Sequence, residues 1–136
     1  MKLTYLIDTD WAVWWLRDRP EVGAKLRDRE QEGLAISAVT LAELWEGVEG
    51  SADPLRARTA LEGFLRLVHV LPFSDEVARL FGKEAVRLGK LGQTIPDFDL
   101  VIAATALHHD LILMSEDRTH FSRIPGLKLE SLASPG

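Results

Sequence analysis

Short apolar runs alternate with longer stretches of helical periodicity along the chain. Strands are predicted over residues 3–7, 34–37, 68–72 and 111–114, and residues 128–130 are expected to form an edge strand. Helices are predicted over residues 10–18, 20–32, 40–50, 54–67, 74–91 and 97–108. Strands that alternate with helices are typical of a parallel sheet with helices on both faces. The pattern therefore predicts an α/β fold with a central, mostly parallel sheet of four or five strands.

Two of the predicted helices carry the clearest patterns. The helix over residues 74–91 has apolar side chains at the helical period, namely Val77, Leu80, Phe81, Ala85 and Leu88. The stretch 101–107 (VIAATAL) is apolar around most of its circumference, so this helix is expected to lie inside the molecule. The chain has no recognisable linker or repeat, and we expect one domain over residues 1–136 with an ordered core from about residue 3 to 132.

Composition narrows the class of protein. The chain has 136 residues, 46 % hydrophobic and 27 % charged, which suits one globular domain. The absence of cysteine excludes disulfides and thiolate metal sites. There is no apolar run of membrane-spanning length, and the acidic Asp8 comes too early for a signal peptide, so a cytoplasmic protein is expected. The net charge of −5 disfavours a broad phosphate-binding surface, although carboxylates that hold a metal ion would still attract nucleic acid.

Four acidic residues stand at the boundaries of predicted elements. Asp8 follows the first strand, and Asp117 comes shortly after the strand that ends at residue 114. Glu43 and Asp99 each lie in the first turn of a predicted helix. Because active sites of such sheets lie beyond the carboxyl ends of the strands, we expect the four side chains to converge there. Carboxylate oxygens suit Mg²⁺ or Mn²⁺, including a two-metal site for phosphodiester cleavage.

Each of these residues also has a purely structural interpretation. Asp8 could cap the first helix, and Thr40 with Glu43 fits a capping box. An acid such as Asp99 complements a helix N-terminus, and Asp117 could be a turn residue. Taken singly, the four positions leave both interpretations open.

The order of several short segments resembles that of the PIN-domain ribonucleases. These segments are residues 6–10 (LIDTD), residues 37–44 (SAVTLAEL) with Gly47, residues 99–106 (DLVIAATA) and residues 114–117 (MSED) with Phe121. Their spacing is most similar to that of VapC-type toxins of toxin–antitoxin pairs. The resemblance covers residues 3 to about 132 and implies a PIN-like three-layer fold. It also implies a Mg²⁺- or Mn²⁺-dependent ribonuclease that forms a homodimer or higher even oligomer and is inhibited by a cognate antitoxin protein.

Carried over position by position, the resemblance assigns the metal-binding and catalytic roles to the four acids. They are Asp8, Glu43, Asp99 and Asp117. A further set of residues could belong to the outer shell of the site, namely Asp97, Ser115, Asp10 and Thr9. Two positions depart mildly from the family pattern. Ser115 stands where threonine is more frequent, and Asp10 stands where asparagine or serine is frequent.

Tryptophans and histidines complete the list of candidate residues. The tryptophans Trp11, Trp14, Trp15 and Trp45 either pack in the core or, as the resemblance implies, line a groove for the antitoxin. The histidines are not expected to bind metal. His108 and His109 suit a helix C-terminus, and His120 lies close to Asp117 in the sequence.

Two other functions compete with the ribonuclease. The pair Asp8 and Asp10 after a strand fits a small haloacid-dehalogenase-like phosphatase, but Ala12 occupies a position where that family has a hydroxyl residue or valine, and no catalytic lysine is evident. A non-catalytic PIN-like binding module is the second alternative. Loss of a site carboxylate would favour it, and all four are present.

Overall fold

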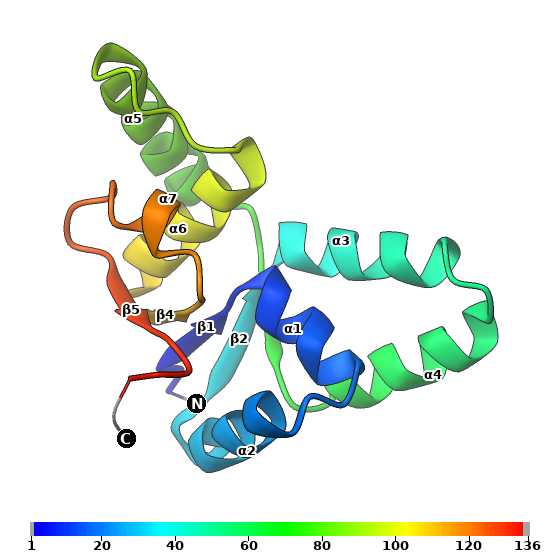
Figure 1. Cartoon of the computed structure of the whole chain (residues 1–136). Helices are drawn as coiled ribbons and strands as arrows, with labels where there is room; N and C mark the ends of the chain where they lie inside the picture. The colour runs from blue at the N-terminus through cyan, green and yellow to red at the C-terminus, as the bar shows by residue number, and fades with distance from the viewer. Residues whose placement is uncertain (1, 135–136) are drawn as a thin grey trace.

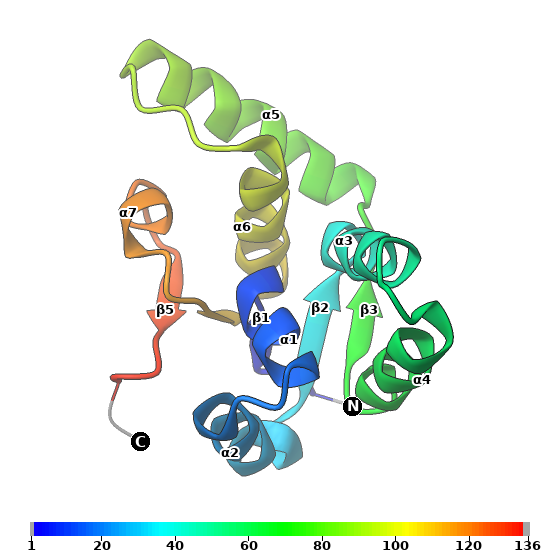
Figure 2. The same cartoon turned by 45° about the vertical axis from the view of Figure 1, so that its right-hand side comes forward.

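A five-stranded parallel sheet forms the centre of the molecule. A computed structural model describes residues 2–134 of the chain. The strands are β1 (Tyr5–Ile7), β2 (Leu34–Ser37), β3 (His69–Leu71), β4 (Ile112–Met114) and β5 (Lys128–Glu130). They are arranged in the order β3-β2-β1-β4-β5, and every pairing is parallel (Figures 1 and 2). The predicted α/β class and parallel sheet are confirmed.

In the part of the chain that the structure describes, seven α-helices and one 3₁₀ helix connect the strands. They are α1 (Thr9–Leu16), α2 (Pro20–Arg29), η1 (Glu30–Glu32), α3 (Ala38–Glu49), α4 (Pro54–Leu65), α5 (Asp75–Lys90), α6 (Asp97–His109) and α7 (Arg118–Phe121). Within residues 2–134, none of these helices has the length and apolar character needed to cross a membrane.

Side chains that alternate along the strands divide the core into two layers. Tyr5 and Ile7 of β1 face a cluster built with α1, α2, α3 and α4. Leu6, between them, faces the opposite cluster, which is built mainly with α6. Because successive side chains of a strand point to opposite faces, each strand contributes to both layers. Figure 2 shows the resulting arrangement, with α1 and α2 on one side of the sheet and α6 on the other.

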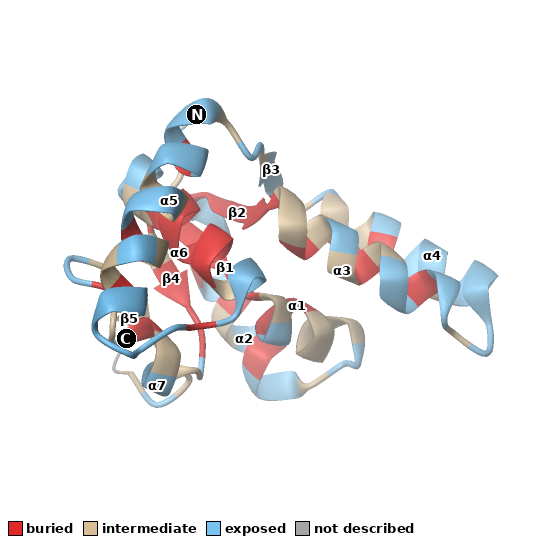
Figure 3. Cartoon of the chain, turned by 90° about the horizontal axis from the view of Figure 1, so that it is seen from above, coloured by how far each residue is buried: buried red, intermediate tan, exposed pale blue. Residues whose placement is uncertain are grey.

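The helix α6 is the interior helix that the sequence pattern predicts. Every residue from Leu100 to Ala106 is buried (Figure 3), since α6 is covered by the sheet on one side and by α5 on the other. The helices α3 and α4 form a hairpin that projects beyond the sheet (Figures 1 and 3). This arrangement leaves α1, α3 and the first turn of α6 around the carboxyl ends of β1 and β4.

Two local predictions were wrong. The helix α3 begins at Ala38 rather than at Thr40, because the hydroxyl of Ser37 accepts the Val39 N–H and caps the helix. The capping box of Thr40 and Glu43 is therefore not the start of α3. The short helix α7 was not expected, since four residues are too few to display a helical period.

Candidate metal centre

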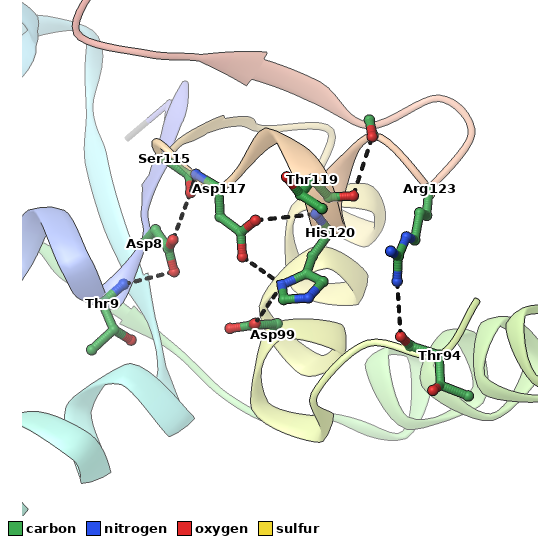
Figure 4. Close-up of polar contacts among 10 residues, drawn as sticks. Asp8, Thr9, Thr94, Asp99, Ser115, Asp117, Thr119, His120 and Arg123 are labelled. Atoms are coloured by element: carbon green, nitrogen blue, oxygen red, sulfur yellow. Dashed lines mark hydrogen bonds and ion pairs between the residues drawn. The ribbon is translucent and has the colours of Figure 1, made fainter. Parts of the chain in front are cut away.

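Asp8 lies at the carboxyl end of β1 and is the N-cap of α1. Its backbone N–H donates to the Met114 carbonyl at 3.0 Å, which extends the pairing of β1 with β4. Its Oδ1 accepts the Thr9 N–H at 2.8 Å, and its Oδ2 accepts the Ser115 hydroxyl at 2.6 Å (Figure 4). Both carboxylate oxygens are therefore held in place by donors from the ends of two neighbouring strands.

The surroundings of Asp8 make its negative charge costly. Asp8 is 4 % exposed. Burial raises the pKa of its carboxyl to about 7, because the charged form loses its hydration. The hydrogen bonds from Ser115 and Thr9 lower the pKa, while the charges of Asp10 and Asp99 raise it. A divalent cation beside this carboxyl would favour its charged form.

Asp117 and His120 lie on the far side of Ser115. The Asp117 N–H donates to the Ser115 hydroxyl oxygen at 3.0 Å, so this one side chain contacts both Asp8 and the Asp117 backbone. Asp117 is also the N-cap of α7, where its Oδ1 accepts the His120 N–H at 3.1 Å. Its Oδ2 lies 2.7 Å from Nδ1 of the His120 ring.

Asp99 approaches the same point from the first turn of α6. Its Oδ2 lies 3.7 Å from Nδ1 of His120, and one ligand atom from each of Asp99, Asp117 and His120 lies within 4.8 Å of the others (Figure 4). Burial raises the pKa of Asp99, and the neighbouring charge of Asp117 raises it further, while His120 lowers it. The charges of Asp10 and Glu43 also raise it, so Asp99 lies in the field of three other carboxylates.

Glu43 extends from α3 toward the site and is held there by hydrogen bonds that involve two threonine hydroxyl groups. The Thr9 hydroxyl donates to Glu43 Oε1 at 2.8 Å and lies 2.9 Å from the Thr40 hydroxyl. Since Thr9 has a single hydroxyl proton, which it gives to Glu43, Thr40 is the donor in the second contact. Glu43 is thus held beside Thr9, and Thr40 fixes the orientation of the Thr9 hydroxyl.

The two remaining acids differ in their relation to this cluster. Asp10 lies on α1 with an exposed side chain, and partial loss of hydration on the side that faces the site, together with the charge of Asp117, raises its pKa. The charge of Asp10 in turn raises the pKa of Asp8 and of Asp99. Asp97 is exposed at the start of α6 and lines a small cavity of about 70 Å³ between α5 and α6. Asp10 therefore adds to the negative field, whereas Asp97 lies toward α5.

The donor set suits a divalent metal ion. Carboxylate oxygens from Asp99 and Asp117 and a ring nitrogen from His120 lie close enough to share one ion, and Asp8 is joined to them through Ser115. The sequence interpretation expected no histidine to bind metal, so His120 was not among its site residues. The signal for it is its spacing from Asp117, since residues three apart on a helix lie on one face.

The four tryptophans have different environments. Trp11 is fully buried, and its indole N–H donates to Glu116 at 3.1 Å, so it belongs to the core. Trp14, Trp15 and Trp45 are half-buried. The guanidinium of Arg19 lies 4.3 Å from the centre of the Trp14 ring, a contact typical of a covered surface aromatic.

A groove lies between α1, α3 and α4. It encloses about 290 Å³, and we refer to it as the α1–α3–α4 groove. It is lined by Val13, Leu16, Arg17, Glu43, Leu44, Gly47, Val48, Ser51, Ala57 and Ala60. Its walls are mainly apolar, with Arg17 and Glu43 as charged members, and the four tryptophans are not part of this lining. Because Glu43 belongs both to the groove and to the carboxylate cluster, the groove leads to the site.

Comparison with known proteins gives consistent matches over nearly the whole chain. The PIN domain family model matches residues 5–127. The chain is 31 % identical to the tRNA(fMet)-specific endonuclease VapC of Shigella flexneri, over 94 % of this chain and 97 % of that protein. It is also 31 % identical to ribonuclease VapC2 of Haemophilus influenzae, over 95 % and 98 % of the two chains. Among solved structures, VapBC2 from Rickettsia felis bound to a DNA fragment from its promoter superposes with a TM-score of 0.89 at 27 % identity, over 95 % of this chain and 98 % of that one.

Proposed function

Since the chain belongs to the PIN-domain family and to its VapC group, we propose that it is a metal-dependent endoribonuclease, the toxin of a toxin–antitoxin pair. The observation that carries this proposal is the meeting of Asp8, Asp99 and Asp117 beyond the carboxyl ends of β1 and β4. The expected cofactor is Mg²⁺ or Mn²⁺, since oxygen-rich sites suit hard cations.

In phosphodiester hydrolysis, the site residues would have different roles. Asp8, Asp99 and Asp117 would hold the ion, with Ser115 and the Thr9 N–H fixing the direction of the Asp8 oxygens. When bound, a divalent ion polarises the scissile phosphate and lowers the pKa of a water molecule. Glu43, held by the Thr9 hydroxyl, would orient the attacking water and accept its proton.

RNA is the substrate class that this reasoning supports. The relatives in Shigella flexneri and Haemophilus influenzae carry the names of an RNA endonuclease and a ribonuclease. The chain carries a net charge of −5, so a bound cation would be needed to offset the acidic cluster where a phosphate enters. We expect single-stranded or loop RNA to be cleaved, and the cytoplasm to be the place of action.

An antitoxin protein is the expected partner. The VapBC2 complex of Rickettsia felis, which pairs a VapB with a VapC chain, supports this expectation. We propose that a segment of the antitoxin occupies the α1–α3–α4 groove through apolar side chains and an acidic group opposite Arg17. Where the groove reaches Glu43, a basic side chain of that segment would neutralise part of the negative charge of the carboxylates and compete with the metal ion for them.

The two alternatives have less support. The family model that matches residues 5–127 is that of the PIN domain rather than of a phosphatase. A non-catalytic module would be expected to lack part of the acidic set, whereas all four carboxylates are present and three of them are joined by contacts through Ser115 and His120.

A ribonuclease assay with a matched variant pair tests the proposal. The purified chain should cleave RNA with Mg²⁺ or Mn²⁺, and a chelator should stop the reaction. Asp8→Asn should abolish cleavage, whereas Asp28→Asn, an exposed carboxyl change on α2, should cleave at the wild-type rate. Both variants are purified in parallel, because a contaminating nuclease would give equal activity in all three samples. Cleavage by Asp8→Asn at the wild-type rate would place catalysis outside this cluster.

A further inference from the structure

The side chain of His120 lies among the carboxylates that the proposed function assigns to the metal ion. We propose that His120 supplies a nitrogen ligand to that ion, so that the centre binds later transition metals such as Co²⁺ far more tightly than Mg²⁺. The inference rests on the proposed metal dependence and specifies the kind of ion that the site prefers.

The distances around the His120 ring fit ligation. Its Nδ1 lies 2.7 Å from Asp117 Oδ2 and 3.7 Å from Asp99 Oδ2. Ligand atoms lie about 2.1 Å from such ions, so neighbouring ligands of an octahedral site are separated by about 3.0 Å. The two separations in the structure, 2.7 and 3.7 Å, lie on either side of this value. A small shift of the side chains would therefore place all three atoms at ligand distance from one ion.

The position of His120 is held from two directions. Asp117 Oδ1 accepts the His120 backbone N–H, which leaves Oδ2 of the same carboxylate directed at the ring. The next residue, Phe121, is 1 % exposed and anchors α7 in the core layer that contains α6. Beyond α7, the Arg123 guanidinium donates to the Thr94 carbonyl at 3.0 Å, which ties this segment to the loop before α6 (Figure 4). These contacts hold the ring near Asp99.

The chemistry of the donor set predicts the preference among ions. Imidazole nitrogen binds Co²⁺, Ni²⁺ and Zn²⁺ well, whereas Mg²⁺ prefers carboxylate and water oxygens and keeps several waters. A site made of carboxylates alone would discriminate weakly between Mg²⁺ and Co²⁺. With His120 in the set, the discrimination should depend on one side chain.

A second role for His120 makes a different prediction. If the ring only holds the Asp117 carboxylate in place by a hydrogen bond, loss of that hydrogen bond should lower the affinity of the site for every divalent ion to the same extent. If the ring is a ligand, its loss should lower the affinity for Co²⁺ and leave the affinity for Mg²⁺ nearly unchanged. The comparison of two metals therefore separates ligation from positioning.

The test measures metal binding by the full chain rather than activity. Calorimetric titration with Co²⁺ and with Mg²⁺ is carried out on the wild type, His120→Asn and His108→Asn. Asparagine keeps a donor near the position of Nδ1 for the hydrogen bond to Asp117 but is a poor ligand for Co²⁺. His108 is the matched control, since it is exposed and lies nine residues after Asp99 on α6, roughly 13 Å along the helix axis.

We expect His120→Asn to lose at least about tenfold in Co²⁺ affinity, with Mg²⁺ affinity within about threefold of the wild type. His108→Asn should match the wild type for both ions. In the Co²⁺-loaded wild type, proton NMR should show a strongly shifted, exchangeable imidazole N–H signal, and this signal should be absent from His120→Asn. The NMR readout on the wild type does not depend on how well the variant folds.

Three results would overturn the inference. Equal changes in the Co²⁺ and Mg²⁺ affinities of His120→Asn, including no loss of either, would exclude His120 as a ligand and leave it at most a positioning residue. Binding of Co²⁺ to the wild type without the shifted imidazole signal would exclude ligation while leaving the metal dependence intact. Failure of the wild type to bind either ion would remove both this inference and the proposed metal-dependent function.

Discussion

The Ser115 hydroxyl donates to Asp8 Oδ2 at 2.6 Å and accepts the Asp117 N–H at 3.0 Å. One buried side chain at the end of β4 therefore sets the direction of the first acid and the backbone position of the last. Since Ser115 stands where threonine is more frequent in the family, the hydroxyl rather than the rest of the side chain is the feature that matters.

Removal of this hydroxyl should destabilise the folded protein and slow RNA cleavage. In Ser115→Ala, buried Asp8 loses a donor, which should cost about 1–3 kcal/mol in the free energy of unfolding at pH 8 and raise the pKa of Asp8 further. Ser115→Thr, which keeps the hydroxyl, should retain most of the cleavage rate. Denaturant unfolding and RNA cleavage measured on both variants check this. Equal behaviour of the alanine and threonine variants would show that the hydrogen bond is unimportant.

Without metal, stability should fall as pH rises from about 4 to 7. Asp8 has a pKa of about 7 in the folded protein against the ordinary aspartate value of 3.8, so the folded state binds its proton more tightly than the unfolded state. Its contribution is fully present below the unfolded pKa and is lost as pH rises to the folded one, by up to roughly 4 kcal/mol. The raised pKa of Asp99 acts in the same direction. Urea unfolding in the presence of a chelator at pH 5 and pH 8 measures how the free energy of unfolding changes with pH. The change should be smaller in Asp8→Asn than in the wild type.

Divalent ions should stabilise the protein more at pH 8 than at pH 5. Ligand carboxylates must be charged to bind metal, and Asp8 is largely protonated at the lower pH. An ion present at a hundred times its dissociation constant adds about 2.7 kcal/mol to the free energy of unfolding. The rise in melting temperature with Mn²⁺ should be clear in the wild type at pH 8 and small in Asp99→Asn. A rise of the same size at both pH values would argue against binding by these carboxylates.

Filling the α1–α3–α4 groove should block the antitoxin without harming the fold. A Cβ atom added at Gly47 meets no neighbouring atom within 4 Å, and the groove beyond it has room for a longer side chain, so Gly47→Leu should fold and gain up to about 1 kcal/mol from the better helix propensity of leucine. Its affinity for the antitoxin should fall at least tenfold, because the new side chain occupies the groove. Gly63→Leu is the control, since Gly63 also has open space on a helix but does not line the groove. Titration calorimetry with the antitoxin compares the two, and equal affinities would place the partner elsewhere.

The outer face near α5 should be the surface between two copies of the chain. Large apolar side chains are exposed along α5 and its flanking segments, namely Phe73, Val86, Leu91 and Phe98. Val86 is 58 % exposed, so Val86→Asp should leave the monomer's fold intact while placing a charge in an apolar contact. Light scattering should find a dimer for the wild type and a monomer for the variant. A wild type that is monomeric at high micromolar concentration would contradict the dimer.

Local sequence patterns were sufficient for most of the fold. Strand β2 and strand β5 have the bounds that the pattern predicts, and α4 begins at the predicted Pro54. The interior position of α6 follows from its middle section, which is apolar around most of its circumference and is stable only when it is buried. The start of α3 was misplaced, because Ser37 and Thr40 are both good caps and the choice between them depends on where β2 ends.

The candidate site could be predicted only in part. The alternation of strands and helices indicates a parallel sheet, whose strands all have their carboxyl ends at one edge, so Asp8 and Asp117 are predicted at that edge. Only the structure shows that β1 and β4 are neighbours there. The Ser115 hydroxyl reaches Asp8 at 2.6 Å, and the Thr9 hydroxyl rather than that of Thr40 reaches Glu43 at 2.8 Å, each across a long separation in the sequence. Such distances have no counterpart in a local pattern.

The sequence by itself determined the α/β class, the order of the elements and the four acids at their boundaries, because each of these depends on residue type and on spacing along the chain. Only the tertiary structure decided that His120 joins Asp99 and Asp117, that Trp11 is core, and that Glu43 belongs both to the carboxylate cluster and to the groove. The physical reason is that burial, charge repulsion and hydrogen-bond partners depend on which elements pack together. The short α7 takes its position from the burial of Phe121 in the core and from the hydrogen bonds around it, rather than from a helical pattern in its four residues.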